Sequence, residues 1–233
     1  MENLDGPEPE VPAIPRDAAT LILIRDRETR PQVLMGQRGA TASFFPSRFV
    51  FPGGAVDKSD WTVPLAAPMN ATCLARLARH DAEPDLTGGL VAAAIRELWE
   101  ETGLILGTPG GWDTTPPKGW ETFAATGHRP TGEGLTYLFR AITPTVLPKR
   151  FDARFLMADA ALLKTDPDDF SRADSELSYL QWIPLDEARN FKLPHITNVV
   201  LDDVAAAIGH DGPPENVRFF YNAPGVKEYR SIA

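Results

Sequence analysis

Three glutamates near the middle of the chain have the spacing of a single acidic site. Glu97, Glu100 and Glu101 lie three and four residues apart, so on a helix that advances about 100° per residue they fall within an arc of about 100°. Repulsion between carboxylates at this spacing costs a few tenths of a kcal/mol per pair and favours a bound cation. Because these ligands offer only oxygen, the expected ion is Mg²⁺ or Mn²⁺.

The residues around the three acids predict the helix that positions them. The side of this helix opposite the acids is apolar and suited to burial, and its residues are Val91, Ile95, Leu98, Trp99 and Thr102. Arg96 precedes Glu100 by four residues and can orient its carboxylate. Gly103 most readily adopts the left-handed conformation that stops a helix. We therefore expect a buried helix that ends immediately after its acids.

A solvated surface helix is the ordinary interpretation of three glutamates alone, so neighbouring motifs matter. A short apolar segment, residues 48–51, leads into Gly53 and Gly54. Paired glycines let the backbone approach a ligand closely or take a positive φ. An ordinary tight turn is the alternative for such a pair.

Together these residues resemble the box that defines the Nudix hydrolases. Residues 96–104, Arg-Glu-Leu-Trp-Glu-Glu-Thr-Gly-Leu, match its second half, and Gly54 followed by Asp60 has the spacing of its first half. The family places seven residues between that acid and the arginine, whereas residues 61 to 95 intervene here, so a contiguous pattern search would fail. Asp60 also stands where glutamate is usual. We interpret residues from about 61 to 88 as an insertion.

The resemblance implies a fold, an activity and a set of roles. The fold is a Nudix-type α/β/α sandwich, an α/β architecture with a mixed central sheet. The activity is attack of water on a phosphorus of a nucleoside diphosphate that is linked to another group. By position, the metal ligands are Glu97, Glu100, Glu101 and the carbonyl of Gly53. Glu97 is either a ligand or the catalytic base, and Arg96 orients the acids.

A narrower resemblance concerns the substrate. Gln37-Arg38, residues 51–54, the insertion and residues 150–155 look like the acyl-coenzyme A diphosphatase branch. Another coenzyme A signature requires an arginine and a glycine where Ser43 and Ser47 stand. Coenzyme A or an acyl-coenzyme A is the first hypothesis, and ADP-sugars or NADH-type nucleotides are the alternative. A sensor that binds a nucleotide without cleaving it is a third, although such proteins usually lose acids that this helix keeps.

Forked guanidinium donors suit phosphate groups, so the candidate substrate-binding residues are Arg38, Arg48, Arg150 and Arg154. In residues 150–157 charged and apolar side chains alternate, which predicts a half-buried strand. A solvated sheet face with an internal ion pair is an equal alternative for the last two arginines. Asp60 and Glu176 are candidate accessory acids.

One Nudix domain is expected over residues 17–209. Residues 1–16 hold four prolines and several acids and predict a disordered arm. Strands are predicted at 18–24 and 32–37, joined as a hairpin, and at 135–142, 150–157, 177–183 and 217–221, with a helix at 195–208. Residues 210–233 are expected to form a C-terminal tail.

Composition narrows the functional class. The chain of 233 residues is 43% hydrophobic with a net charge of −9, which argues against a broad electrostatic grip on nucleic acid. A single cysteine excludes an intramolecular disulfide, and the absence of a long apolar run or signal peptide predicts a cytoplasmic protein without a membrane partner. The expected partner is a small nucleotide diphosphate, and a homodimer is left open.

Overall fold

The structure of the protein, a computed structural model, describes residues 9–42, 44–79, 85–210 and 212–233. Residues 1–8 of the expected arm, residues 80–84 of the insertion and Ser43 lie outside the described residues.

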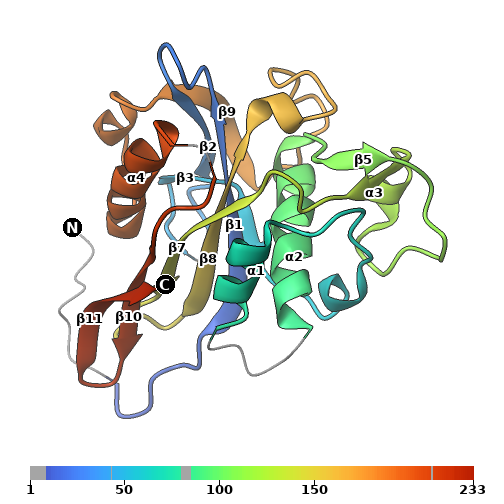
Figure 1. Ribbon diagram of the computed structural model, residues 1–233. Coiled ribbons are helices and arrows are strands. Elements are labelled where there is room, and N and C mark those ends of the chain that lie inside the picture. Colours follow the sequence, from blue (N-terminus) through green and yellow to red (C-terminus); the bar gives the residue numbers. More distant parts are fainter. Residues whose placement is uncertain (1–8, 43, 80–84, 211) are drawn as a thin grey trace.

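A mixed sheet of nine strands forms the centre of the molecule (Figure 1). Its order is β11-β10-β7-β8-β1-β2-β3, with β4 paired to β1 and β9 paired to β2. Pairing is parallel between β1 and β8 and between β7 and β10, and antiparallel elsewhere. The strands are β1 (Arg16–Arg25), β2 (Gln32–Arg38), β3 (Phe49–Val50), β4 (Gly53–Ala55), β7 (Thr136–Ile142), β8 (Phe151–Asp159), β9 (Leu177–Pro184), β10 (Val217–Ala223) and β11 (Val226–Ile232).

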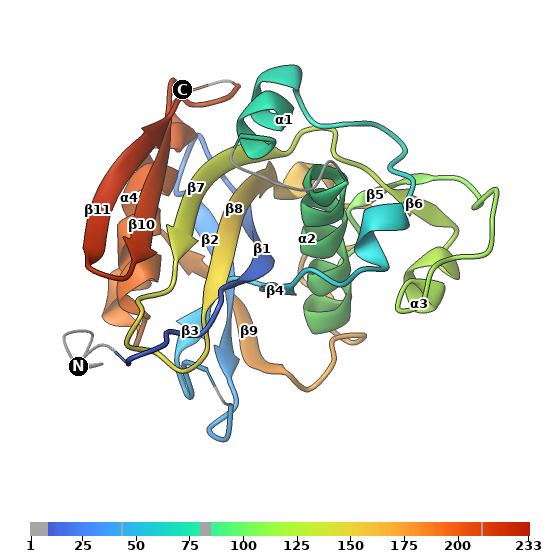
Figure 2. The same ribbon diagram turned by 90° about the horizontal axis from the view of Figure 1, so that it is seen from below.

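Helices cover both faces of this sheet, which confirms the α/β/α sandwich. Figure 2 shows α1 and α2 on one side of the sheet and α4 on the other. The alternation of β1 supplies both cores: Leu21 and Leu23 face the α2 layer, and Ile22 and Ile24 face α4. The helices are α1 (Ala71–Leu77), α2 (Leu86–Thr102), α3 (Glu121–Ala124) and α4 (His195–Ile208); β5 (Gly107–Pro109) pairs with β6 (His128–Pro130), and short 3-10 turns are Asp60–Thr62, Ala160–Leu162 and Ala188–Asn190.

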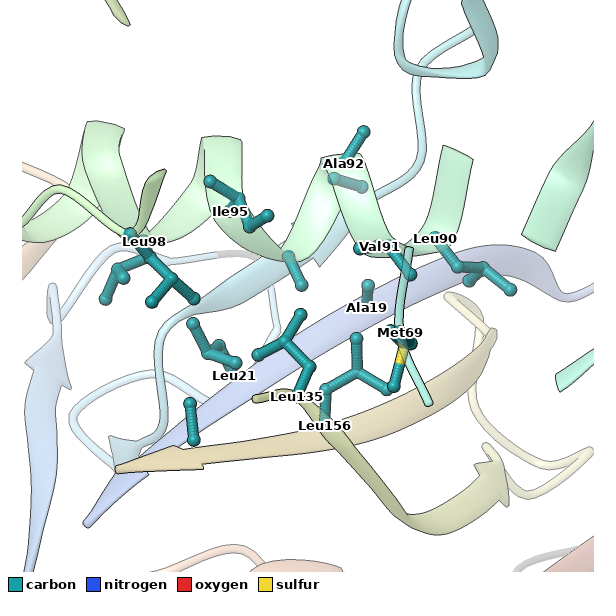
Figure 3. Packing of buried hydrophobic residues seen from close by; sticks show 14 of the residues in the cluster. Ala19, Leu21, Met69, Leu90, Val91, Ala92, Ile95, Leu98, Leu135 and Leu156 are labelled. Carbon is teal, nitrogen blue, oxygen red and sulfur yellow. The ribbon is translucent and has the colours of Figure 1, made fainter. Parts of the chain in front are cut away.

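The helix α2 has the boundaries that its sequence predicts at the acidic end. It stops at Thr102 because Gly103 adopts the left-handed conformation, with φ of 74°. Val91, Ile95 and Leu98 are fully buried, and Figure 3 shows them directed at apolar side chains of the sheet such as Leu21. The buried face thus fixes α2 on the sheet and holds its acids in one place.

The insertion is part of the core on the α2 side of the sheet. Met69, Cys73 and Leu77 are buried in the same cluster as α2. A Cβ placed on Gly89 of α2 would meet the ring of Trp61 at 2.5 Å, so this glycine allows the insertion to pack closely on the helix. The described part of the insertion therefore packs on α2 as part of the hydrophobic core.

The C-terminal segment contains the strand predicted at 217–221 and a second strand where a tail was expected. Residues 217–232 form β10 and β11, and β10 joins the sheet beside β7. Phe219 and Phe220 alternate into the two cores, whereas β11 is exposed along all but its last residue. That exposure, with several charged residues, explains why the sequence of β11 resembles a tail. No helix among the described residues is long and apolar enough to span a membrane.

Candidate active site

The acids of α2 meet the glycine pair of β4. The pairing of β4 with β1 places Gly53 opposite Thr20 and Gly54 opposite Ala19. A Cβ on Gly54 would overlap the carboxylate of Glu97, and a Cβ on Gly53 would meet the carbonyl oxygen of Ala19 at 2.6 Å. The Gly53 amide donates to Glu101 Oε2 at 2.8 Å. Gly54 thus allows the strand to approach Glu97 closely, and Gly53 allows it to pack closely on β1.

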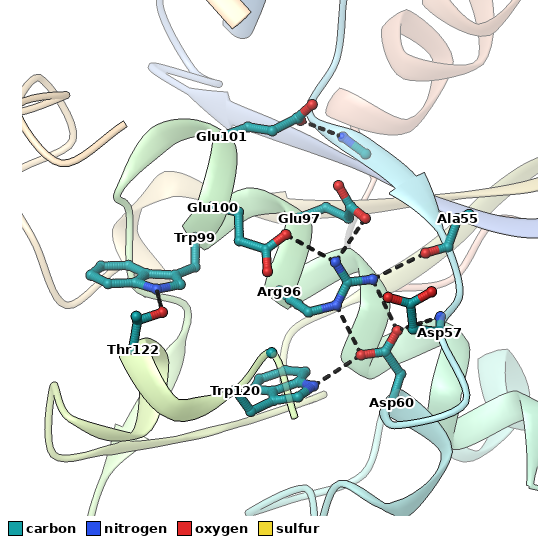
Figure 4. Close-up of polar contacts among 12 residues, drawn as sticks. Ala55, Asp57, Asp60, Arg96, Glu97, Trp99, Glu100, Glu101, Trp120 and Thr122 are labelled. Carbon is teal, nitrogen blue, oxygen red and sulfur yellow. Dashed lines mark hydrogen bonds and ion pairs between the residues drawn. The ribbon is translucent and has the colours of Figure 1, made fainter. Parts of the chain in front are cut away.

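Arg96 lies at the centre of a hydrogen-bond network (Figure 4). Its Nη1 donates to Glu97 Oε1 and to Glu100 Oε2, both at 2.9 Å. Its Nε and Nη2 donate to the two oxygens of Asp60, both at 3.0 Å, and Nη2 also donates to the Ala55 carbonyl. Arg96 therefore orients two of the three acids of α2.

Asp60 is fully buried and acts as the anchor of Arg96. Besides the two bonds from Arg96, its carboxylate accepts from Trp120 Nε1 at 2.9 Å and from the Asp57 amide at 2.8 Å. Sequence reasoning missed Trp120, because a contact between residues so far apart leaves no spacing signal. The structure places Asp60 behind Arg96 rather than beside the acids that meet Gly53 and Gly54.

Burial perturbs all three acids of α2. It raises the pKa of Glu97 to about 7, against the opposing effect of Arg96. Burial also raises the pKa of Glu101 well above its usual range, and repulsion from Glu97 adds to this shift. The pKa of Glu100 is raised by burial as well. The folded protein thus holds carboxylates whose ionised forms are poorly stabilised, which is where a cation binds favourably.

The donor chemistry of these residues fits a hard divalent cation, since every available ligand is an oxygen. The positions of the described acidic side chains do not by themselves enclose an ion. Within the described residues, no three His, Cys, Asp or Glu side chains surround a common ion position. Arg96 occupies one oxygen of Glu97 and one of Glu100, so an ion would use the oxygens that remain.

A cavity of about 340 Å³ opens beside Glu97, Gly53 and Gly54. Arg38 and Glu176 also line it and form an ion pair at 2.9 Å, so the structure brings these two predicted residues to the site. Aromatic side chains form much of its wall, namely Phe44, Phe45, Phe51, Phe151, Phe155 and Phe220. None of the described residues of the insertion lines this cavity.

The other predicted arginines do not line the cavity, and their side chains bind groups of the protein itself. Arg48 donates to the carbonyl of Leu193. Arg150 is buried and donates to three backbone carbonyls, those of Ala13, Thr143 and Asn222. Arg154 is also buried and pairs with Asp17 and Asp152. The alternative interpretation expected a solvated face with an internal ion pair; the pair of Arg154 with Asp152 is present, but both arginines are buried.

Two cations at the cavity were not predicted. Arg16 is the first residue of β1, and Lys149 lies two residues before the start of β8. Both side chains are exposed and line the cavity. No motif contains them, because only the parallel pairing of β1 with β8 brings the two segments together.

Comparisons with known proteins agree with this geometry. No protein-family model matches the sequence. The Caenorhabditis elegans protein "Putative nudix hydrolase 7" is 31% identical over 180 residues, which are 72% of this chain and 51% of that protein. The chain thus spans about half the length of this curated relative.

The chain also resembles solved structures of Nudix proteins. The NUDIX hydrolase from Alicyclobacillus acidocaldarius is 27% identical, with a TM-score of 0.63 over 84% of this chain and 93% of that chain. The NUDIX domain of Shewanella oneidensis NrtR, solved in complex with ADP ribose, is 14% identical with a TM-score of 0.48, over 88% and 96% of the two chains; a likeness at that level says nothing about substrate. The sandwich fold, the acidic box divided by the insertion and the match to the Caenorhabditis elegans protein show that the chain belongs to the Nudix hydrolase family.

Proposed function

We propose that this protein is a metal-dependent diphosphatase that hydrolyses a nucleoside diphosphate linked to another group. The observation that carries the proposal is the contact of Glu97 and Glu101 with the Gly53–Gly54 segment beside the cavity, with Glu100 held next to Glu97 by Arg96. A surface helix rich in glutamate would not bury these acids, raise their pKa values and place one of them in the wall of a cavity.

Glu97, Glu100, Glu101 and the carbonyl of Gly53 would hold the ion. Bound Mg²⁺ or Mn²⁺ supplies a water of lowered pKa and neutralises charge on the phosphates. The buried carboxylates are the reason that this site prefers a cation to solvent, since burial disfavours their unpaired ionised forms. Arg96 keeps Glu97 and Glu100 in fixed positions through its anchor, Asp60.

Glu97 has the properties of a general base as well as those of a ligand. Its pKa of about 7 is suited to accepting a proton near neutral pH. It also lines the cavity, where a substrate diphosphate would lie. Arg38 lines the same cavity and is our candidate cation for that diphosphate, and it forms an ion pair with Glu176.

Within this class we propose coenzyme A or an acyl-coenzyme A as the substrate, cleaved to 3′,5′-ADP and a phosphopantetheine fragment. The support is the resemblance of residues 37–38 and 51–54 to that branch, together with an apolar, aromatic cavity that suits a base or an acyl group. ADP-sugars and NADH-type nucleotides are the alternative substrates. A nucleotide sensor is the alternative without catalysis, and the retention of all three acids disfavours it.

The test is a panel of diphosphate substrates assayed with Mg²⁺ and with Mn²⁺, with products identified by mass. We expect turnover that is abolished by chelation and reduced by orders of magnitude in Glu100→Gln and Glu101→Gln. Glu187→Gln is the matched control, because Glu187 is exposed and pairs with Arg30 away from the cavity. Full activity in excess chelator, or parental turnover in both site variants, would refute the proposal.

The role of Glu97 needs a separate measurement. Glu97→Gln should lose rate in either role, so Mn²⁺ affinity must be measured on the same variant. Retained affinity with lost rate marks a base, whereas loss of both marks a ligand.

A further inference from the structure

Two cationic residues, Arg16 and Lys149, line the cavity at some distance from its acidic residues. Gly54 lies opposite Ala19, and Arg16 is three residues earlier on the same strand. At about 3.3 Å per residue, Arg16 begins about 10 Å along the strand from the glycine pair. The Arg16 amide donates to the Arg150 carbonyl at 3.0 Å, so Lys149 belongs to the same region. The acids and these two cations therefore line separate parts of one cavity.

Charge is distributed unevenly along this cavity. Its only acidic lining residues in the described chain are Glu97 and Glu176. Both belong to the acidic part, since Glu176 pairs with Arg38 and raises the pKa of Glu97 by repulsion. Among the residues that the structure describes, no carboxylate lies within ion-pair distance of Arg16. The part of the cavity at Arg16 is thus suited to an anion.

Aromatic rings stand next to these cations. Phe151 is the register partner of Arg16, and its ring meets that of Phe44 edge-on at 5.2 Å. The rings of Phe44 and Phe45 lie 4.0 Å apart. Phe45 has a positive φ of 52°, a conformation that is rare for a bulky residue and is found most often at functional positions. Such a wall offers stacking surfaces for a planar base.

We propose that Arg16 and Lys149 bind a second phosphate group of the substrate, one that is separate from the diphosphate to be cleaved. In this arrangement the acids of α2 face the diphosphate, the phenylalanine wall takes the base, and Arg16 with Lys149 takes the additional phosphate. The inference rests on the proposed function and narrows its substrate class. Nucleotides with an additional phosphate on the 2′ or 3′ oxygen of the ribose are favoured over ADP-sugars and NADH, which lack that phosphate.

Substrate pairs that differ by that one phosphate provide the test. The pairs are coenzyme A with dephospho-coenzyme A, and NADPH with NADH. We expect the parental protein to prefer the phosphorylated member of at least one pair by roughly tenfold or more in kcat/KM, since a contact with a charged group is worth that much. The preference should come mainly from KM and weaken as salt is added.

The variants assign this preference to residues. Arg16→Gln and Lys149→Gln should each lower the preference severalfold, and Arg16→Lys should keep part of it. Arg230→Gln is the control, because it removes the same charge from exposed β11, away from the cavity, and should leave the preference unchanged. A preference that Arg16→Gln and Lys149→Gln both leave intact would overturn the proposal, as would equal kcat/KM within both pairs.

A binding measurement separates this inference from the proposed function. Calorimetric titration with adenosine 3′,5′-bisphosphate and with AMP needs no turnover. Tighter binding of the bisphosphate, lost in Arg16→Gln, would support the phosphate site even if no diphosphate were hydrolysed. Equal affinity for the two ligands, in a protein that does hydrolyse a diphosphate, would reject the phosphate site and leave the diphosphatase standing.

Discussion

Asp60 and Arg96 form a buried, two-pronged ion pair, with both hydrogen bonds at 3.0 Å. Asp60 contributes from the segment after the glycine pair and Arg96 from α2, so this contact joins the two halves of the acidic box. The sequence had suggested a minor part for Asp60, and its complete burial shows a larger one.

We therefore expect Asp60→Asn to impair both stability and turnover. Breaking one partner of a buried ion pair costs about 3–5 kcal/mol, because the other charge is left uncompensated. Arg96 would then no longer be held where it orients Glu97 and Glu100. Chemical denaturation measures the first effect and kcat the second. Asp57→Asn is the control, since Asp57 is exposed three residues away; equal effects from the two substitutions would contradict this role.

Gly54→Ala should lower turnover while the protein remains folded. The added Cβ would overlap the carboxylate of Glu97, so the acid must leave its present position. A fall in kcat of at least tenfold is expected, because small displacements of reacting groups have effects of this order. Gly209→Ala serves for comparison, since a Cβ there meets nothing within 4 Å. Parental kcat in a folded Gly54→Ala protein would show that this close contact has no catalytic consequence.

Stability without metal should fall as pH rises from about 4.5 towards 7 and above. Folding raises the pKa of Glu97 to about 7 and that of Glu101 well above its usual value. The folded state therefore keeps protons that the unfolded state releases from about pH 4.5, and stability decreases with pH in that range. Urea unfolding in chelator across this range measures the slope. Glu97→Gln should flatten it, and a rising slope in the parental protein would contradict the burial of these acids.

Leu77→Ala in the insertion should destabilise the protein without altering KM. Leu77 is almost completely buried against the α2 layer, and truncation of such a side chain costs about 2–5 kcal/mol. None of the described residues of the insertion lines the cavity, so substrate binding should be unaffected. Leu74→Ala, at a half-buried position of the same helix, should cost less. An increase in KM for Leu77→Ala at full folding would instead indicate that the insertion acts on the cavity.

Local patterns predicted the parts of the fold that depend on neighbours in the chain. The spacing of Glu97, Glu100 and Glu101, and the stop at Gly103, predicted α2 because a helix brings residues three and four apart together. The hairpin of β1 and β2 and the helix α4 followed from periodicity in the same way.

Contacts between segments that are distant in the sequence could not be predicted from such local patterns. Arg150 and Arg154 have the residue type for phosphate binding, but the packing of β8 buries them. Arg16 and Trp120 gained their positions only through strand pairing and the tertiary fold. The edge strand β11 was missed because its exposed, charged surface lacks the alternation of a half-buried strand.

The length of chain between Asp60 and Arg96 has a thermodynamic consequence. Thirty-five residues, 61 to 95, separate the two ends of this ion pair, where the usual box has seven. By the logarithmic dependence of loop-closure entropy on length, the longer segment costs only about 1.4 kcal/mol more to close. The burial of Met69, Cys73 and Leu77 is large enough to offset that cost. The two halves of the box can therefore lie far apart in the sequence and still meet in space, provided that the intervening residues pack into the core beside α2.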